Sequence, residues 1–359
     1  MIRFLSIFLV FVVCMPSLAQ QTDIKYDDHV DLSYYLDAQN KRNPIKTVAD
    51  WEKRRTSVFA GMQQIMGSLP TPKHPIALEM RVHEEIKTER FVRQLISYHT
   101  DSSERRVRAY LFIPSITDTV RPAVLCLHQT IGIGKKEPAG LGGNPQLHYA
   151  LHLAERGFIT LAPDYPSFGD YAYTFPAEDG YISGTMKAVY ENTRAIDLLQ
   201  SLKKVDGQRI GCIGHSLGGH NTIFSAAFDS RIKAMVSNCG FTRFHKYYGG
   251  KLKGWTSPRY MPLINDKYGN DPDRVTFDFP EIIASFAPRP FLASAPVDDS
   301  NFDVSGVKDT IKQVAAIYSL YDADENLQAN YPAAAHSFPA DARNIAYQFL
   351  EKHLGLEKP

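Results

Sequence analysis

Three shortages in the sequence each exclude a class of protein. It has only four cysteines in 359 residues, which is too few for the disulfide framework of a small secreted domain. Lys and Arg total 40 against 39 Asp and Glu, so no excess of either charge indicates a nucleic-acid partner or an acidic tail. Beyond the amino terminus there is no long apolar run, and a membrane helix needs about 20 such residues. The overall composition, 44% hydrophobic and 22% charged, is typical of a folded globular protein.

The one marked apolar run lies at the amino terminus, in MIRFLSIFLVFVVCMPSLAQQ. A positive charge at Arg3, the apolar residues 4–13 and the small residues Ser17 and Ala19 predict a signal peptide, residues 1–19, that is cleaved after Ala19. A lipid anchor on Cys14 is the alternative, although the bulky residue before it disfavours that reading. We therefore expect a secreted or periplasmic protein without a membrane span.

Cleavage would leave three cysteines, Cys126, Cys212 and Cys239, all in or beside apolar runs. An odd number cannot pair completely, so we interpret them as small core residues. No CxxC pair and no Cys or His pair at zinc spacing occurs. We expect neither a metal nor an organic cofactor.

The hydrophobic periodicity changes along the chain. Residues 20–75 predict a helical lead-in, because Trp51, Val58, Met62 and their neighbours recur three or four positions apart. Residues 76–359 predict the main domain. Its first part, 76–114, alternates apolar and polar residues in three runs, as antiparallel strands with one wet face do.

From Arg121 onward, short apolar runs alternate with helix-like segments. The runs are AVLCLH, FITLAPDYP, RIGCIGHS, AMVSNCG and PFLASAP, and the segments are 146–156, 181–204, 217–228, 305–320 and 339–354. This alternation predicts an α/β fold, with a doubly wound, mostly parallel sheet and antiparallel leading strands. Residues 240–280 do not fit it and predict an insertion, because so long a connection is uncommon unless it is functional.

A serine stands between glycines where an apolar strand turns into a helix, in RIGCIGHSLGGHNTIF. Its centre, Gly214 to Gly218, reads G-x-S-x-G, which in this context predicts a nucleophile elbow that exposes Ser216 at the carboxyl edge of the sheet. The alternative is a glycine-rich turn that only packs a helix on a sheet. The N–H of Leu217 is the first predicted oxyanion donor.

A serine nucleophile needs a histidine base, which follows it in the chain in this type of fold. We expect His220 to point away along the helix, while His245 lies in the insertion and His353 in the last helix. His336 lies between the strand-like NLQANYP and a helix that begins near Pro339. It is the predicted base, because catalytic groups collect at the carboxyl ends of strands.

The acid that orients this base is expected at the end of an earlier strand. AMVSN is followed by Cys239 and Gly240, without a carboxylate, whereas PFLASAPV is followed by Asp298 and Asp299. Spacing leaves both aspartates open, and we favour Asp299.

A second oxyanion donor is expected in the loop after AVLCLH. Gln129 is the predicted donor, and Thr130 is comparably placed. The glycines of the following GIGKKEPAGLGG do not form a phosphate-binding motif, and we expect them to shape a loop beside the site.

Together these motifs resemble the α/β-hydrolases, over about residues 105 to 355, and within them the secreted bacterial branch related to dienelactone hydrolases and acetyl xylan esterases. The resemblance is carried by LCLHQT, LAERGFITLAPDYPSFGDY, RIGCIGHSLGGHN, APRPFLASAPVDDSNF and AAAHSF. The register of the APRP motif implies that Asp299 is the acid. Two positions depart from the pattern: Gln129 stands where the family has glycine, and Ser216 where dienelactone hydrolases have cysteine.

The insertion supplies candidates for substrate contact. It carries six aromatic residues interleaved with Lys246, Lys251, Lys253 and Arg259; the aromatics are Phe241, Phe244, Tyr247, Tyr248, Trp255 and Tyr260. Aromatic rings stack on sugars and cations attract carboxylates, so an acylated or acidic carbohydrate is one hypothesis, with Trp255 and Tyr260 as binding residues. The alternative is a small satellite core beneath a long connection.

The predicted function is therefore a serine hydrolase that cleaves carboxylic esters through an acyl-enzyme. A peptidase or amidase of the same fold is the first alternative; a short amino-terminal region and the lack of an acidic pair for a peptide amino terminus disfavour it. A non-catalytic binding protein is the second, and the presence of all three triad residues disfavours it. The acyl group, the alcohol and the oligomeric state are left open by the sequence.

Overall fold

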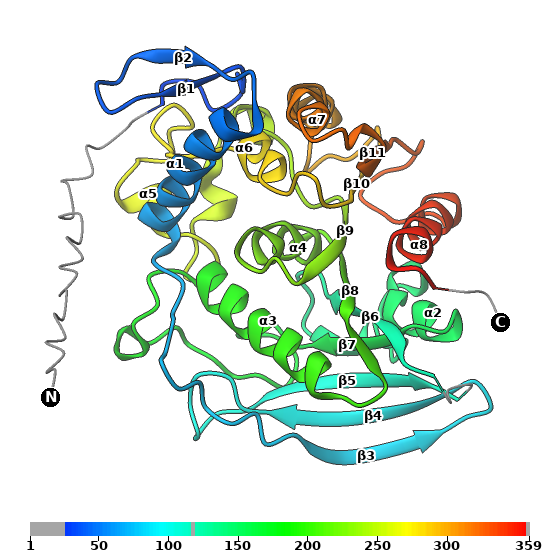
Figure 1. Ribbon diagram of the computed structural model, residues 1–359. Helices are drawn as coiled ribbons and strands as arrows, with labels where there is room; N and C mark the ends of the chain where they lie inside the picture. The colour runs from blue at the N-terminus through cyan, green and yellow to red at the C-terminus, as the bar shows by residue number, and fades with distance from the viewer. Residues whose placement is uncertain (1–25, 116–118, 357–359) are drawn as a thin grey trace, which may run out of the picture.

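A computed structural model describes residues 26–115 and 119–356 (Figure 1). The predicted signal peptide, residues 1–19, and Cys14 lie outside the described residues. No helix within the described part of the chain has the length and apolar character to cross a membrane.

A nine-stranded sheet forms the centre of the molecule, in the order β11-β10-β9-β8-β6-β7-β5-β4-β3. The strands are β3 (Arg81–Lys87), β4 (Phe91–Tyr98), β5 (Val107–Pro114), β6 (Arg121–Leu127), β7 (Ile159–Pro163), β8 (Val205–His215), β9 (Ile232–Asn238), β10 (Phe291–Ser294) and β11 (Leu327–Asn330). β3, β4, β5 and β7 pair antiparallel in succession, and the strands from β7 to β11 pair parallel. The predicted α/β class, with antiparallel leading strands, is confirmed.

Helices cover both faces of this sheet (Figure 1). The α-helices are α1 (Val48–Met66), α2 (Tyr149–Glu155), α3 (Gly184–Ser201), α4 (Leu217–Phe228), α5 (Leu263–Asp266), α6 (Phe279–Ala284), α7 (Val304–Ser319) and α8 (Ala340–Leu354). The 3₁₀ helices are η1 (Gly134–Lys136), η2 (Pro145–Leu147), η3 (Ala177–Asp179), η4 (Phe244–Gly249), η5 (Leu252–Trp255) and η6 (Asp324–Asn326). One core includes α1, α3, α4, α6 and α7, and a second includes α2 and α8.

The parallel strands are almost wholly buried, which explains why they read as continuous apolar runs rather than alternating ones. All five residues of β7 and six of the seven residues of β6 are buried. Cys126, Cys212 and Cys239 are buried free thiols, and the prediction that they are small core residues is confirmed.

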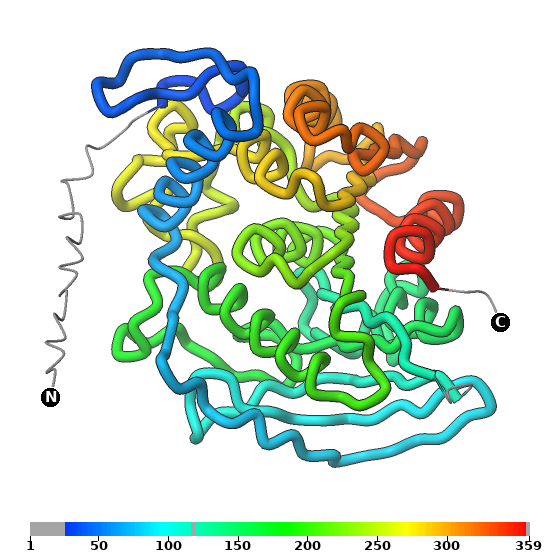
Figure 2. The backbone as a smooth tube through the Cα atoms, viewed as in Figure 1, coloured from blue at the N-terminus to red at the C-terminus, as the bar shows by residue number. Residues whose placement is uncertain are grey.

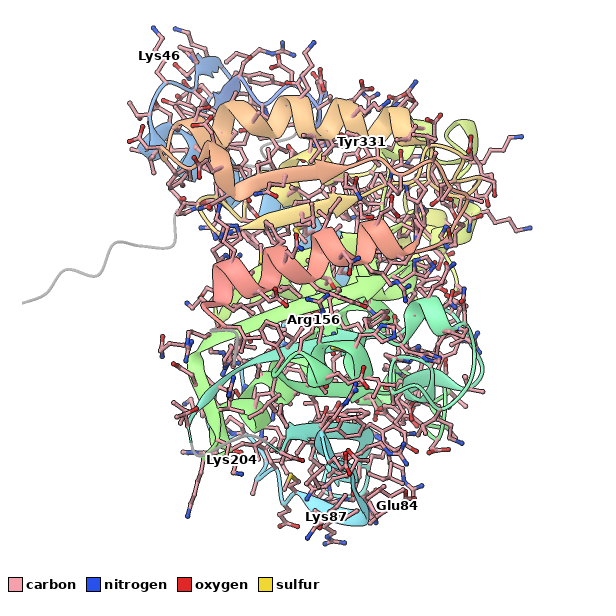
Figure 3. The ribbon with its side chains drawn as sticks, turned by 90° about the vertical axis from the view of Figure 1, so that its right-hand side faces the viewer. Lys46, Glu84, Lys87, Arg156, Lys204 and Tyr331 are labelled. Atoms are coloured by element: carbon pink, nitrogen blue, oxygen red, sulfur yellow. The ribbon has the colours of Figure 1, made fainter. Side chains whose placement is uncertain are left out.

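Figure 3 shows the sheet from the α8 side, with Lys46 of the amino-terminal segment at the top and Glu84 and Lys87 of β3 at the bottom. The edge strand β3 is exposed along its whole length. Its charged side chains discourage pairing with another chain, as is usual for an edge strand. Near the middle of this view, Arg156 joins α2 to α8 through a 2.6 Å ion pair with Glu351.

The amino-terminal segment packs on the insertion (Figure 2). It contains β1 (Tyr34–Leu36) and β2 (Arg42–Pro44), an antiparallel pair that the sequence did not predict, and α1. A capping box between Thr47 and Asp50 begins α1, and Trp51 and Met62 are buried at the predicted helical spacing. Thr276 of the insertion donates to the Gly61 carbonyl at 2.7 Å. The amino-terminal segment therefore covers the outer side of the insertion.

Candidate active site

Ser216 lies on a strained turn between β8 and α4. Its φ of 54° and ψ of −119° fall outside the regions that non-glycine residues ordinarily adopt. Its N–H donates to the Asn238 carbonyl at the end of β9, at 2.9 Å, and its hydroxyl makes no capping bond to α4. The side chain is thus left available at the carboxyl edge of the sheet.

The two glycines of the motif are required by close backbone contacts. A Cβ on Gly214 would lie 2.1 Å from the carbonyl carbon of Gly218, and one on Gly218 would lie 1.8 Å from the Leu127 oxygen at the end of β6. Any larger residue would push α4 away from the strands that carry it. The sharp turn therefore depends on these two positions.

His336 and Asp299 form a hydrogen-bonded pair at the ends of β11 and β10. His336 Nδ1 lies 3.0 and 2.9 Å from the two carboxylate oxygens of Asp299, and Asp299 also accepts the N–H groups of Asn301 and Phe302. Burial would raise the pKa of Asp299, but the bond and charge of His336 and these two N–H groups outweigh it and lower the pKa. Asp298 is exposed, so the structure joins Asp299 and not Asp298 to the histidine.

The orientation of His336 leaves its Nε2 available, because Nδ1 faces the carboxylate. Its ring stacks on that of Phe302, with 5.9 Å between the ring centroids, and lies beside the His215 ring, with 4.7 Å between the centroids. Asn238 donates to His215 Nδ1 at 2.6 Å and to the Ser337 carbonyl at 3.1 Å, so it fastens the loop that carries His336. His215 and Asn238 thus position the histidine, and sequence patterns offered no signal for this role.

The loop after β6 is held on both sides of Gln129. Burial lowers the pKa of His128; this ring donates to the Gln129 carbonyl at 2.6 Å and accepts the Tyr165 N–H at 2.9 Å. The Gln129 side chain donates to Glu137, at 3.1 and 2.9 Å from its two oxygens. Glu137 and Gly143, against which it packs, belong to the glycine-rich stretch, which does shape a loop beside the site.

A cavity of about 370 Å³ brings these groups together. Its walls come from the loop after β6, the start of α4, the insertion and the loops after β10 and β11. The lining residues are Gln129, Thr130, Ser216, Leu217, His220, Tyr247, Tyr248, Gly254, Trp255, Tyr260, Asn301, Phe302 and His336. Ser216 and His336 face this cavity without a hydrogen bond between them, and Leu217 begins α4, where the first N–H groups of a helix have no partner inside it.

The structure divides the aromatics of the insertion into two groups. Phe241 and Phe244 are buried in the main core, to which Trp255 also belongs, whereas Tyr247, Tyr248, Trp255 and Tyr260 line the cavity. The hydroxyl groups of Tyr260 and Thr130 form a hydrogen bond of 3.2 Å. None of Lys246, Lys251, Lys253 and Arg259 is among the lining residues. The insertion thus supplies both a satellite core and one wall of the cavity.

The expectation that His220 points away along the helix is wrong. Its ring lines the cavity, 4.9 Å from the Trp255 ring and 4.4 Å from that of Phe224. The position of His220 on α4 sets only the direction of its side chain. The insertion folds over this side of the helix, so the ring faces the cavity. His245 is half-exposed and pairs with Asp273, and it does not line the cavity.

Among the described residues, one group of side chains could hold a metal ion: ligand atoms of Cys239, Asp299 and His336 lie within 4.8 Å of one another. Burial, and then the Asp299 carboxylate, raises the pKa of the Cys239 thiol, which opposes the thiolate that a metal needs. An ion bound here would also break the bond between Asp299 and His336. The arrangement therefore suits a metal centre poorly.

A mostly parallel sheet with helices on both faces, carrying Ser216 on its strand-to-helix turn, defines an α/β-hydrolase. The particular family follows from sequence: residues 146–356 match the model of the prolyl oligopeptidase family, and the chain belongs to that family. The predicted resemblance to α/β-hydrolases is confirmed; its secreted branch stays a prediction.

Several known proteins share this architecture. "Putative hydrolase YtaP" of Bacillus subtilis (strain 168) is 28% identical over 318 residues, which is 84% of this chain and 99% of YtaP. A glucuronoyl esterase from Solibacter usitatus has a TM-score of 0.72 at 16% identity, covering 91% of this chain and 98% of its own. An acetyl xylan esterase from Paenibacillus sp. R4 has a TM-score of 0.57 at 15% identity, with 87% and 96% covered. At these identities the two structures show a common fold.

Proposed function

We propose that the protein is an exported serine hydrolase that cleaves carboxylic esters. The observation that carries the proposal is the arrangement around one cavity: a serine on a strained turn, and a histidine whose Nδ1 is engaged by a buried carboxylate. A serine hydroxyl becomes nucleophilic when a base takes its proton, and the base needs a third group to hold its tautomer. Ser216, His336 and Asp299 are the residue types that this chemistry requires.

In the proposed mechanism, Ser216 Oγ attacks the ester carbonyl carbon while His336 Nε2 takes the hydroxyl proton. The oxyanion formed accepts hydrogen bonds from the backbone N–H of Leu217 and from the backbone N–H of Gln129 in the loop after β6. The C–O bond then breaks, and His336 returns the proton to the leaving alcohol. A water molecule releases the acid from Ser216 by the same steps, with His336 again as base.

The substrate that we propose is an ester of a carbohydrate. The cavity wall offers aromatic faces and hydroxyl groups, and the fold is common to a glucuronoyl esterase and an acetyl xylan esterase. The lining residues carry no Lys or Arg side chain. An uncharged ester therefore suits the cavity better than a substrate with a free carboxylate.

A peptidase is the second candidate, because the family is named for prolyl oligopeptidase. The lining residues of the cavity include no Asp or Glu, so it offers no carboxylate to a peptide amino terminus. A panel of sugar acetates, aryl acetates and aminoacyl anilides separates the two. Higher kcat/KM on the anilides than on the esters would favour the peptidase.

The choice of acid leads to a matched pair of variants. Asp299→Asn should lower kcat by about 10⁴-fold, because the amide stabilises the wrong tautomer of His336. Asp298→Asn should stay within a few-fold of the wild type, since its carboxylate is exposed. Rates with p-nitrophenyl acetate measure both. Equal losses in the two variants would contradict the assignment.

Activity should depend on the protonation of a single histidine. Burial lowers the pKa of His215 and of His220 to about 3, so both stay neutral at ordinary pH, and Asp299 stays ionised because its pKa is lowered. Protonated His336 is no longer a base, so kcat/KM should fall toward acid pH in one proton step. A profile that does not fall toward acid pH would contradict His336 as base.

A further inference from the structure

His220 is a buried polar residue that the proposed mechanism does not use. It lies one helical turn after the nucleophile, and its N–H donates to the Ser216 carbonyl at 2.9 Å. The residue is 2% exposed, and its ring stands in the cavity wall among aromatic rings. Since one helical turn rises about 5.4 Å, a ligand bound at Ser216 lies within reach of this ring.

Neither ring nitrogen of His220 has a hydrogen-bond partner among the described residues, and the same holds for the indole nitrogen of Trp255. Both side chains line the same cavity, with ring centroids 4.9 Å apart. An unpaired buried polar group destabilises a fold, and most such groups in folded proteins have a partner. Two together on one cavity wall indicate that a ligand supplies the missing partners.

The chemistry of the wall limits what that ligand is. Burial lowers the pKa of His220 to about 3, so its imidazole is neutral, with one donor and one acceptor nitrogen. The indole N–H of Trp255 is a donor only. A hydroxyl group matches both, because it donates and accepts, whereas a carboxylate would leave the acceptor nitrogen unpaired. The lining residues also offer no charged Lys, Arg, Asp or Glu side chain.

We propose that His220 and Trp255 form a binding site for the free hydroxyls of a neutral sugar ring that carries the scissile ester. This inference rests on the proposed esterase function and gives its substrate class. The sugar is either the alcohol of the ester, as in an acetylated pentoside, or its acyl part, as in a uronic acid methyl ester. Both present the same hydroxyl chemistry beside Ser216.

The test compares His220→Phe and His220→Gln on three esters: an acetylated methyl xyloside, methyl glucuronate and p-nitrophenyl acetate. The Phe variant keeps a ring but loses both polar atoms, so KM for one of the sugar esters should rise about tenfold, the equivalent of one hydrogen bond. The kcat/KM for p-nitrophenyl acetate should fall by a smaller factor. The Gln variant should recover part of the loss, and the sugar ester affected tells which half of the substrate is the sugar.

Two further readouts separate a binding role from a structural one. His220→Phe should unfold at a higher temperature than the wild type, because an unpaired polar group is replaced by an apolar one. His353→Phe is the matched control: its Nε2 is also unpaired and it lies on α8, away from the cavity, so it should change no KM. Equal losses on all three esters in His220→Phe, or no loss on any, would overturn the proposal.

Failure of the esterase function is distinguishable from failure of this inference. Binding of the uncharged, unesterified sugars methyl xyloside and methyl glucoside, followed by tryptophan fluorescence, measures the sugar site without catalysis. A wild type that cleaves p-nitrophenyl acetate but binds neither sugar would refute the sugar site alone. A wild type that binds a sugar in a manner weakened by His220→Phe, yet cleaves no ester, would retain the site and refute the esterase.

Discussion

Ser216→Ala is expected to lower kcat on p-nitrophenyl acetate by about 10⁴- to 10⁶-fold, with a residual rate from the oxyanion donors. Alanine fits the same turn as well as serine does, because both residues are unbranched at Cβ and therefore tolerate the φ of 54° equally. The serine hydroxyl makes no capping bond, so the variant should unfold at nearly the same temperature. The loss would then belong to chemistry and not to folding.

A fluorophosphonate probe, followed by digestion and mass spectrometry, locates the activated serine directly. Labelling should be confined to Ser216 and vanish in Ser216→Ala, while Ser319→Ala, an exposed serine at the end of α7, should label like the wild type. A folded wild type that takes no label would mean that the base does not engage Ser216. The non-catalytic binding protein would then become the better hypothesis.

Arg54→Met should lower the free energy of unfolding by about 3 to 5 kcal/mol, the usual loss when one partner of a buried ion pair is removed. Arg54 and Glu281 are buried, with 2.8 Å between Arg54 Nη2 and Glu281 Oε1. Arg54 also donates to the Asp31 carbonyl at 2.5 Å and the Tyr34 carbonyl at 2.9 Å. The guanidinium thus joins the amino-terminal segment to α6, and its removal leaves Glu281 with His29 as its remaining ionic partner and takes a donor from each of these carbonyls.

The neighbouring Arg55 supplies the control, because its pair with Glu52 is largely exposed, at 33% and 46%. Arg55→Met should cost about 1 kcal/mol or less. Urea unfolding of both variants, and of the double variant Arg54→Met with Glu281→Gln, gives the comparison. The double variant should recover part of the loss, because it no longer buries a carboxylate that has lost its arginine partner. Equal losses in Arg54→Met and Arg55→Met would contradict the buried pair.

Much of the site follows from short sequence patterns. The turn at Ser216 was predictable because strand, glycine and helix signals are local, and the close contacts of Gly214 and Gly218 are consequences of that turn. His336 was identified because it follows the last strand. The helix around Trp51 and Met62 could also be predicted, because its apolar residues recur three or four positions apart.

Other features depend on residues far apart in the chain. The choice between Asp298 and Asp299 was left open by spacing, and the structure joins His336 to one of them across 37 positions. The prediction for His220 was wrong because Trp255, 35 positions later, folds over it. The pair between Arg54 and Glu281 spans 227 positions, and no local pattern indicates it.

The α/β class, the strand-to-helix turn at Ser216 and the histidine after the last strand could be predicted from local patterns, because each depends on residues within about one turn or strand of one another. Which aspartate contacts His336, which aromatics of the insertion enter the cavity, and that His220 has unpaired nitrogens there became known from the folded chain alone. Those outcomes depend on packing between distant segments, where burial and the pairing of polar groups, rather than local periodicity, select the arrangement.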